Sequence, residues 1–377
     1  MFADFGLTVA REVPLKLAAG VATGAYKVMG GVVRDDLGRI VGHLVGAGPL
    51  TALGKLVPGL GMLGQLVEQG QLISIGRDVK QIQETLATVL DLSTASVALS
   101  GLGTVTSIAG FAYLSHRLSQ VDDKLLAIER DVKDIKGWLT GLQRAELQYA
   151  IDNLRHAEAA GDQIRQGLLI QAKQAFNTLA HHYREQWAAC RTTAEIAAVD
   201  DLYTVAMLGH ATVCSNLGLG AAAASDLRDN SAAWARQARA HARAMLFEGQ
   251  PERLLAAEFV EPLPARTLVE LLDFAHDSRR GIDWIDDLRA VRARKPTVLD
   301  GLANLPAAMK PRAAAAGSPP EMFALAAALR ARAEVIDANV AHYDFLSARG
   351  LSSTQFKALA EEAVEAAGGD AVCISAG

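Results

Sequence analysis

The sequence predicts a mainly α-helical protein with a small β-hairpin near its N-terminus, and three observations lead to that fold class. Hydrophobic residues make up 50% of the chain and aromatic residues only 5%, so Ala, Leu and Val supply most of the apolar surface, and Ala and Leu are strong helix formers. Apolar residues recur in steps of three and four over long stretches, which is the period of a helix. A Gly-containing turn separates two β-branched runs, which indicates one hairpin.

The N-terminal region, residues 1–64, is rich in Gly and predicts one helix followed by the hairpin. Residues 13–26 fit an amphipathic helix, with Pro14 near its first turn, where a missing N–H costs little. Residues 32–33 and 40–44 are the two β-branched runs, and residues 35–38 supply the turn between them.

Residues 65–143 predict two coiled-coil-like arms that flank an apolar segment. The second arm, at 114–142, carries apolar residues in alternating steps of three and four, which form the seam of a heptad helix. The seam consists of Leu118, Val121, Leu125, Ile128, Val132, Ile135, Leu139 and Leu142. The first arm, at 72–90, follows the same period, and residues 77–82 nearly repeat as residues 130–135. We expect the arms to pack as long antiparallel helices or to drive self-association.

The apolar segment between the arms, residues 92–115, contains no Asp, Glu, Lys or Arg. Its length is close to the roughly 20 residues that a helix needs to cross the hydrocarbon core of a bilayer. Ser, Thr and Gly dilute it, so its insertion is expected to be marginal. The segment therefore fits a single membrane span, the apolar tip of a helical hairpin, or a buried core helix.

Two sets of residues are expected to act in a membrane-inserted form. The residues expected to contact lipid are Leu99, Leu102, Val105, Ile108, Phe111 and Leu114. The residues expected to permit close helix packing or bending are Gly101, Gly103 and Gly110. Small residues have this effect because they let helices approach closely inside a bilayer.

From residue 144 onward the pattern changes to broader apolar faces and predicts stacked helical pairs at 144–300. The first pair turns at Gly161 and Asp162, and further helices are expected near 195–215, 221–247, 265–277 and 282–293. Prolines around an Ala run predict a linker at 301–320. The C-terminal region, 321–377, predicts helices at 321–348 and 353–367 and a terminal strand at 371–375.

Charge and cysteine content narrow the class of protein. The formal net charge of -5, from 37 basic and 42 acidic side chains, lacks the basic excess with which proteins bind DNA or RNA, so we expect no nucleic-acid partner. Three cysteines without CxxC spacing fit a reducing compartment. The N-terminus has no basic region before its apolar run, so no Sec-type signal peptide is predicted. We expect a cytoplasmic or membrane-associated protein.

The sequence contains no convincing motif for catalysis, a cofactor or a metal, and none of these is predicted. Residues 48–56 approach a P-loop but have one residue too many and Leu56 where Ser or Thr must bind magnesium. Residues 59–64 satisfy GxGxxG, but Pro58 precedes them instead of a strand.

An acidic cluster is the best remaining place for a cation or an acid/base pair. It consists of Asp273, His276, Asp277, Asp283, Asp286 and Asp287. Arginines lie beside it at 279, 280 and 289, so simple ion pairs are the preferred interpretation.

The element Gly30-Gly31-Val32-Val33-Arg34-Asp35 resembles one found in a set of uncharacterised bacterial helical proteins. Those proteins carry Gly-Gly-Val-Ile/Val-Arg-Asp near their start, followed by an apolar Gly-containing segment that runs into a heptad helix. The likeness covers residues 1–140. The resemblance implies a bacterial setting and a membrane-associated helical architecture, but no reaction and no role for Gly30, Gly31, Arg34 or Asp35.

These features together predict a membrane-associated or membrane-inserting helical protein, of the pore-forming or membrane-effector type. It would act by assembly and contact rather than by catalysis. The expected partners are a lipid bilayer, further copies of the chain, and a protein bound at the C-terminal helical region. The alternative is a soluble helical scaffold for protein interaction, with residues 92–115 in its core.

Overall fold

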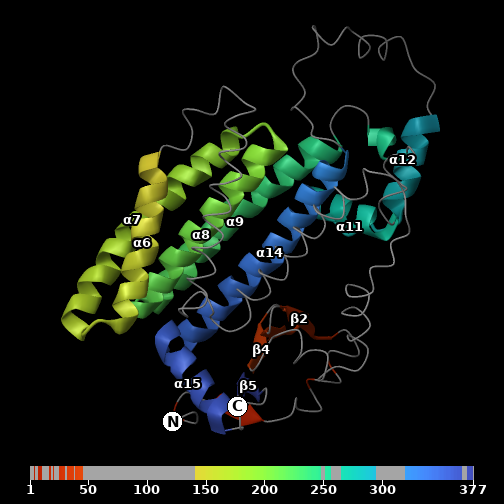
Figure 1. Ribbon diagram of the computed structural model, residues 1–377. Helices are drawn as coiled ribbons and strands as arrows, with labels where there is room; N and C mark the ends of the chain where they lie inside the picture. Colours follow the sequence, from red (N-terminus) through yellow and green to blue (C-terminus); the bar gives the residue numbers. More distant parts are fainter. Residues whose placement is uncertain are drawn as a thin grey trace, which may run out of the picture.

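The computed structural model describes residues 4, 7–10, 17, 20, 25–29, 32–37, 39–45, 141–247, 251–255, 265–293, 319–366 and 372–376. Most of these residues are helical, and the remainder include the short strands of one antiparallel sheet. Figure 1 shows a long helical bundle with the sheet at one end. The mainly helical fold class with a small N-terminal hairpin is therefore confirmed.

The bundle is an up-and-down array in which successive helices pack side by side. Its members are α6 (Gly141–Ala159), α7 (Asp162–Ala189), α8 (Thr193–Asn216), α9 (Gly220–Leu246) and α14 (Pro319–Ala348). The first four pack in chain order, and α14 returns beside α9 and α8. The predicted turn at Gly161 and the helices expected near 195–215, 221–247 and 321–348 are confirmed.

The central helix, α8, is buried along most of its length. A capping box fixes its start: Thr192 Oγ1 accepts a hydrogen bond from the Glu195 N–H at 3.2 Å, and Glu195 Oε2 accepts one from the Thr192 N–H at 2.9 Å. Its end is tied to α15 (Ser353–Ala366), because the backbone N–H and the hydroxyl of Ser353 both donate to Ser215 Oγ at 2.9 Å. α15 corresponds to the helix expected at 353–367.

A second apolar core lies at the end of the bundle far from the sheet. It forms where the end of α9 and the start of α14 meet three further elements: η4 (Pro251–Leu255), α11 (Ala265–His276) and α12 (Asp283–Ala293). Its buried residues are Leu246, Leu254, Leu268, Leu271, Leu272, Trp284, Leu288, Phe323 and Ala326. α11 and α12 confirm the helices expected near 265–277 and 282–293.

The sheet has the strand order β1-β5-β4-β3-β2, and each neighbouring pair is antiparallel. β3 (Val32–Arg34) and β4 (Ile40–Val45) form the predicted hairpin, and β2 (Lys27–Met29) pairs with β3. β5 (Val372–Ala376), which confirms the expected terminal strand, lies between β1 (Leu7–Ala10) and β4. The hairpin thus belongs to a larger sheet than the sequence predicted. The pairs of β5 with β1 and β4 join strands from the two ends of the chain.

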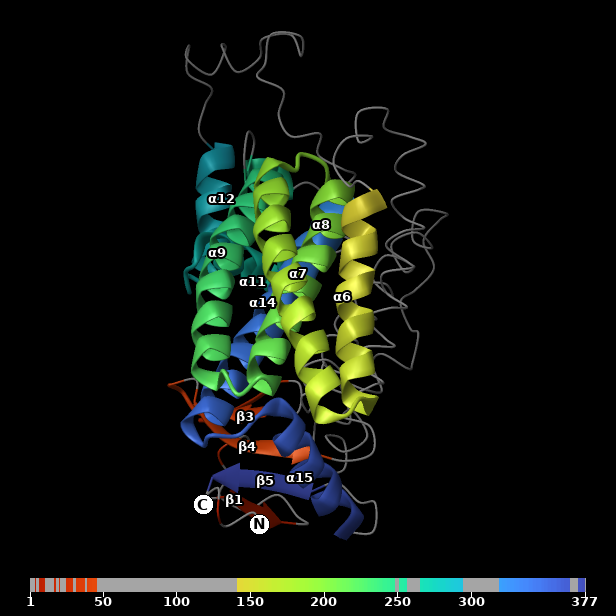
Figure 2. The ribbon, with the colours of Figure 1, turned by 90° about the vertical axis from the view of Figure 1, so that its left-hand side faces the viewer.

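The sheet and the bundle share one core. α14 contacts β2 and β4, and α15 contacts β5 (Figure 2). Leu7, Ile40 and Ile374 of the sheet belong to the same buried cluster as the apolar residues of α6 to α9, α14 and α15. Most residues of the expected helix at 13–26 and of the expected linker at 301–320 lie outside the described residues.

One buried polar network crosses the three central helices. Trp234 Nε1 on α9 donates to Asp200 Oδ1 on α8 at 2.7 Å, and Arg332 Nε on α14 lies 3.5 Å from Asp200 Oδ2. Arg332 also pairs with Asp201. Burial raises the pKa of Asp200 to about 6, and the charge of Arg332 opposes that shift. Because a buried charge is costly without its partner, the network fixes α8, α9 and α14 relative to one another.

Arg332→Leu removes the cation that faces the buried Asp200. We expect the free energy of unfolding to fall by about 3–5 kcal/mol, as is typical when one partner of a buried ion pair is lost. Urea unfolding measures this change. The control is Arg228→Leu, which breaks the exposed ion pair with Asp344 between α9 and α14 and should cost about 1 kcal/mol or less. Equal losses in the two variants would contradict the role assigned to Arg332.

Candidate functional site

Most site residues expected from the sequence lie outside the described residues. These are the lipid-contact residues from Leu99 to Leu114, the three glycines among them, and the seam from Leu118 to Leu139. Leu142, the last seam residue, lies in the first turn of α6. Among the helices of the described ranges, none is both long and apolar enough to cross a membrane.

The acidic cluster is held by ion pairs and turn hydrogen bonds, as the preferred interpretation predicted. Asp273 closes the corner between α11 and α12, where its Oδ1 accepts hydrogen bonds from the Arg280 N–H at 2.8 Å and from Trp284 Nε1 at 2.9 Å. Desolvation raises the pKa of Asp273, but these bonds outweigh it and lower the pKa overall. The other pairs are Asp277 with Arg239, Asp286 with Arg289, and Asp287 with Arg280.

Two residues of the Gly-Gly-Val-Val-Arg-Asp element have structural roles. Asp35 shapes the hairpin turn, because its Oδ1 accepts hydrogen bonds from the N–H groups of Leu37 and Arg39 at 3.0 and 2.8 Å. Arg34 fastens the hairpin to the bundle, because its Nη1 donates to the backbone carbonyl of Asp337 on α14 at 3.2 Å. The two glycines of the element lie outside the described residues.

A pair of buried histidines also joins the sheet to the bundle. His43 on β4 and His342 on α14 are 1% and 5% exposed, and His43 Nε2 lies 3.2 Å from His342 Nδ1. The rings of Phe345 and Phe356 pack against the His43 ring, with centroids 4.7 and 4.8 Å away. Among the described residues, His43 Nδ1 and His342 Nε2 find no hydrogen-bond partner. Within the described part of the chain, neither ring therefore has an anion beside it that would stabilise a second proton.

The surroundings of this histidine pair favour neutral imidazoles. Burial lowers the pKa of both rings, that of His342 to about 4, and the charge of Arg349 lowers that of His43 further. The ordinary histidine pKa is 6.5. Below that pH the unfolded chain binds protons at these histidines, whereas the folded chain does not. The stability that the neutral pair contributes is therefore fully present above pH 6.5 and is lost as the pH falls toward 4. The joint between sheet and bundle is therefore sensitive to acid.

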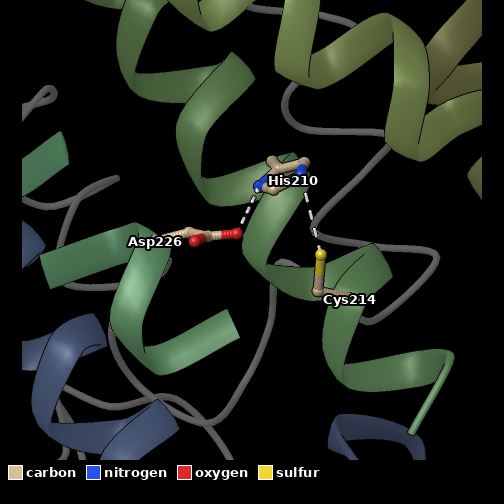
Figure 3. A group of neighbouring side chains, drawn as sticks. All are labelled: His210, Cys214 and Asp226. Carbon is tan, nitrogen blue, oxygen red and sulfur yellow. Dashed lines mark hydrogen bonds and ion pairs between the residues drawn. The ribbon is translucent and has the colours of Figure 1, made fainter. Parts of the chain in front are cut away.

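A second group of side chains brings together a thiol, an imidazole and a carboxylate (Figure 3). His210 and Cys214 lie four residues apart on α8, with His210 Nε2 3.6 Å from Cys214 Sγ. Asp226 on α9 brings its Oδ2 to 3.9 Å from the other ring nitrogen, Nδ1. His210 and Asp226 also line a cavity of about 590 Å³ among α7, α8 and α9.

A thiol beside an imidazole beside a carboxylate is the arrangement of a Cys-His-Asp hydrolase site. The protonation states of this thiol and this imidazole do not fit such a site. Cys214 is 0% exposed, and burial raises the pKa of its thiol to about 11. Burial also lowers the pKa of His210, although the charge of Asp226 opposes that shift, so the imidazolium that would stabilise a thiolate is disfavoured. The cluster instead offers metal ligands, since one donor atom from each residue lies within 4.8 Å of the others. The cluster is not evident from the sequence because Asp226 comes from a different helix; the i, i+4 spacing of His210 and Cys214 is its only local signal.

His342→Phe replaces one buried imidazole by an apolar ring and removes its pH dependence. As the pH drops below about 6.5, wild-type stability should fall relative to this variant, by up to about 1.4 kcal/mol per pH unit for each proton. Urea unfolding over a pH series measures the difference. His181→Gln, at an exposed position on α7, is the control and should follow the wild type. A gap between wild type and His342→Phe that is constant with pH would refute the acid-sensitive joint.

Comparison with protein-family models, curated proteins and solved structures gives no match for this chain. The resemblance in the Gly-Gly-Val-Val-Arg-Asp element therefore remains an expectation. The roles assigned to Arg34 and Asp35, to the histidine pair and to the cluster at His210 rest on their contacts in the structure.

Proposed function

We propose that the chain acts by contact, as a helical body that carries a membrane-associating segment at residues 92–115. The observation that carries this proposal is the absence of Asp, Glu, Lys and Arg over the whole segment. Charge-free runs of about 20 residues are the length that a bilayer core requires. Its Ser, Thr and Gly content makes insertion into the bilayer only marginally favourable. The segment would therefore insert in one state of the protein and stay out of the bilayer in another.

The connection of the segment to the body supports this proposal. β4 ends at Val45 in the sheet, and α6 begins at Gly141 at the far end of the bundle (Figure 2). Residues 46–140 therefore leave the body at one end and rejoin it at the other. The described helices and strands share one buried apolar cluster, which joins the sheet to the bundle. The heptad arms at 72–90 and 114–142 would bring copies of the chain together at the membrane.

A soluble scaffold is the second candidate, and exposed apolar side chains on α6 and α7 favour it. Tyr149, Ile164 and Ile170 are 52%, 66% and 43% exposed. Such residues are suited to a protein partner, although scattered apolar residues are also common on surfaces. In this case residues 92–115 would be part of a soluble core.

Gly103→Arg separates the two functions, because it places a charge in the middle of the apolar segment. Under the membrane proposal the wild type floats with liposomes, and the variant stays folded but no longer floats, since Arg at a bilayer centre costs about 2.5–3.5 kcal/mol or more. Liposome flotation at neutral and acidic pH, with circular dichroism of the free chain, measures both properties.

The matched control is Gly161→Arg, which adds the same charge to the body. Gly161 lies at the start of α7, and a side chain there meets no atom within 4 Å. This variant should float like the wild type. The membrane proposal fails if the wild type stays in the soluble fraction with every lipid composition, or if Gly103→Arg unfolds the free chain as the scaffold function requires.

A further inference from the structure

We propose that His210, Cys214 and Asp226 bind a thiophilic divalent cation of the zinc class between α8 and α9. This site lies in the described body and is independent of the membrane proposal. It would clamp the central helix of the bundle to its neighbour, close to the cavity that opens among α7, α8 and α9.

The spacing on α8 already suits two ligands of one metal ion. Tetrahedral Zn²⁺, with bonds of about 2.0–2.1 Å to nitrogen and about 2.3 Å to sulfur, holds those two atoms about 3.5 Å apart. His210 Nε2 and Cys214 Sγ are 3.6 Å apart. Both residues lie on a rigid, buried helix, so the pair needs no rearrangement of the backbone.

Asp226 closes the site from α9. Its side chain is 47% exposed, and one of its carboxylate oxygens belongs to the set of donor atoms, one from each residue, that lie within 4.8 Å of one another. In the present arrangement its Oδ2 faces His210 Nδ1 at 3.9 Å, the side from which carboxylates orient metal-binding imidazoles. From this position the negative carboxylate favours a cation on the ring.

The protonation states make metal binding dependent on pH. A metal needs a neutral imidazole and a thiolate. Burial lowers the pKa of His210, which keeps the ring neutral. Burial raises the pKa of Cys214 to about 11, although the charge of Lys173 opposes that shift, so the thiol keeps its proton until a cation displaces it. Binding therefore releases a proton, and the apparent affinity rises with pH.

The cavity supplies the remaining requirements of the site. It is lined by His210 and Asp226 together with polar side chains of α7, among them Gln166, Lys173 and Asn177. Such a lining holds water, which can fill the coordination position that three protein ligands leave open. The thiolate and the carboxylate balance the two positive charges of the ion, and Lys173 adds one further positive charge beside the site.

Titration of the full-length chain with Co²⁺ tests the site, because Co²⁺ takes the tetrahedral ligands of Zn²⁺ and a cobalt–thiolate bond has a charge-transfer absorption. We expect a saturable band that Zn²⁺ displaces and that reaches half-saturation at lower Co²⁺ as the pH rises. Cys214→Ser should abolish the band, whereas Cys190→Ser, at the other buried cysteine of the described residues, should keep it.

Asp226→Asn changes an exposed carboxylate and is expected to leave the fold intact. It should weaken Co²⁺ binding by about tenfold or more, as the loss of a ligand or an orienting carboxylate does. Asp229→Asn, exposed on the same helix, is the matched control and should bind like the wild type. The proposal is overturned if the wild type gives no saturable band, or if Cys214→Ser or Asp226→Asn titrates like the wild type.

Discussion

The pairing of β5 between β1 and β4 is the constraint on which the rest of the structure depends. Without β5, β1 would lose the only strand with which it pairs in the described sheet, and β4 would present an open edge. The pairing joins residues 7–10 to residues 372–376, so it closes nearly the whole chain into one loop. The entropy lost in that closure is offset by the core that the sheet shares with the bundle. As a result, the segment at 46–140 begins and ends in the same folded body.

Different chemistry holds the body together at two places along α14. Near the sheet, Arg34 and the neutral pair of His43 and His342 connect the hairpin to α14, which makes this joint firm at neutral pH and weaker in acid. Farther along α14, the buried network of Asp200 and Arg332 depends on opposite charges instead. His43 lies on β4, three residues before residue 46. Loosening of the joint in acid would therefore act at the point where the chain leaves the body toward residues 92–115.

The helical half could be predicted from the sequence because its determinants are local. Gly161 between two apolar faces indicates a turn, and the apolar periodicity indicates the helices on either side of it. The hairpin and β5 were also predicted as strands, but their pairing was not, because the partner of β5 is chosen by contacts between opposite ends of the chain. For the same reason, the contacts of His43 with His342 and of Asp226 with His210 could not be predicted from the sequence. The role of Arg34 depends on the position of the hairpin against α14, whereas Asp35 acts within the turn itself. Residues 92–115, the most distinctive stretch of the sequence, lie outside the described residues.

We propose that a closed helical body carries residues 92–115 to a bilayer while its own fold is preserved. Amide hydrogen exchange of the vesicle-bound chain, compared with the free chain, tests this claim most directly. The account predicts that α8, α14 and β5 keep the protection they have in the free chain, whereas peptides from 92–115 become protected on binding. Loss of protection throughout α8, α14 and β5, or unchanged exchange within 92–115, would contradict it.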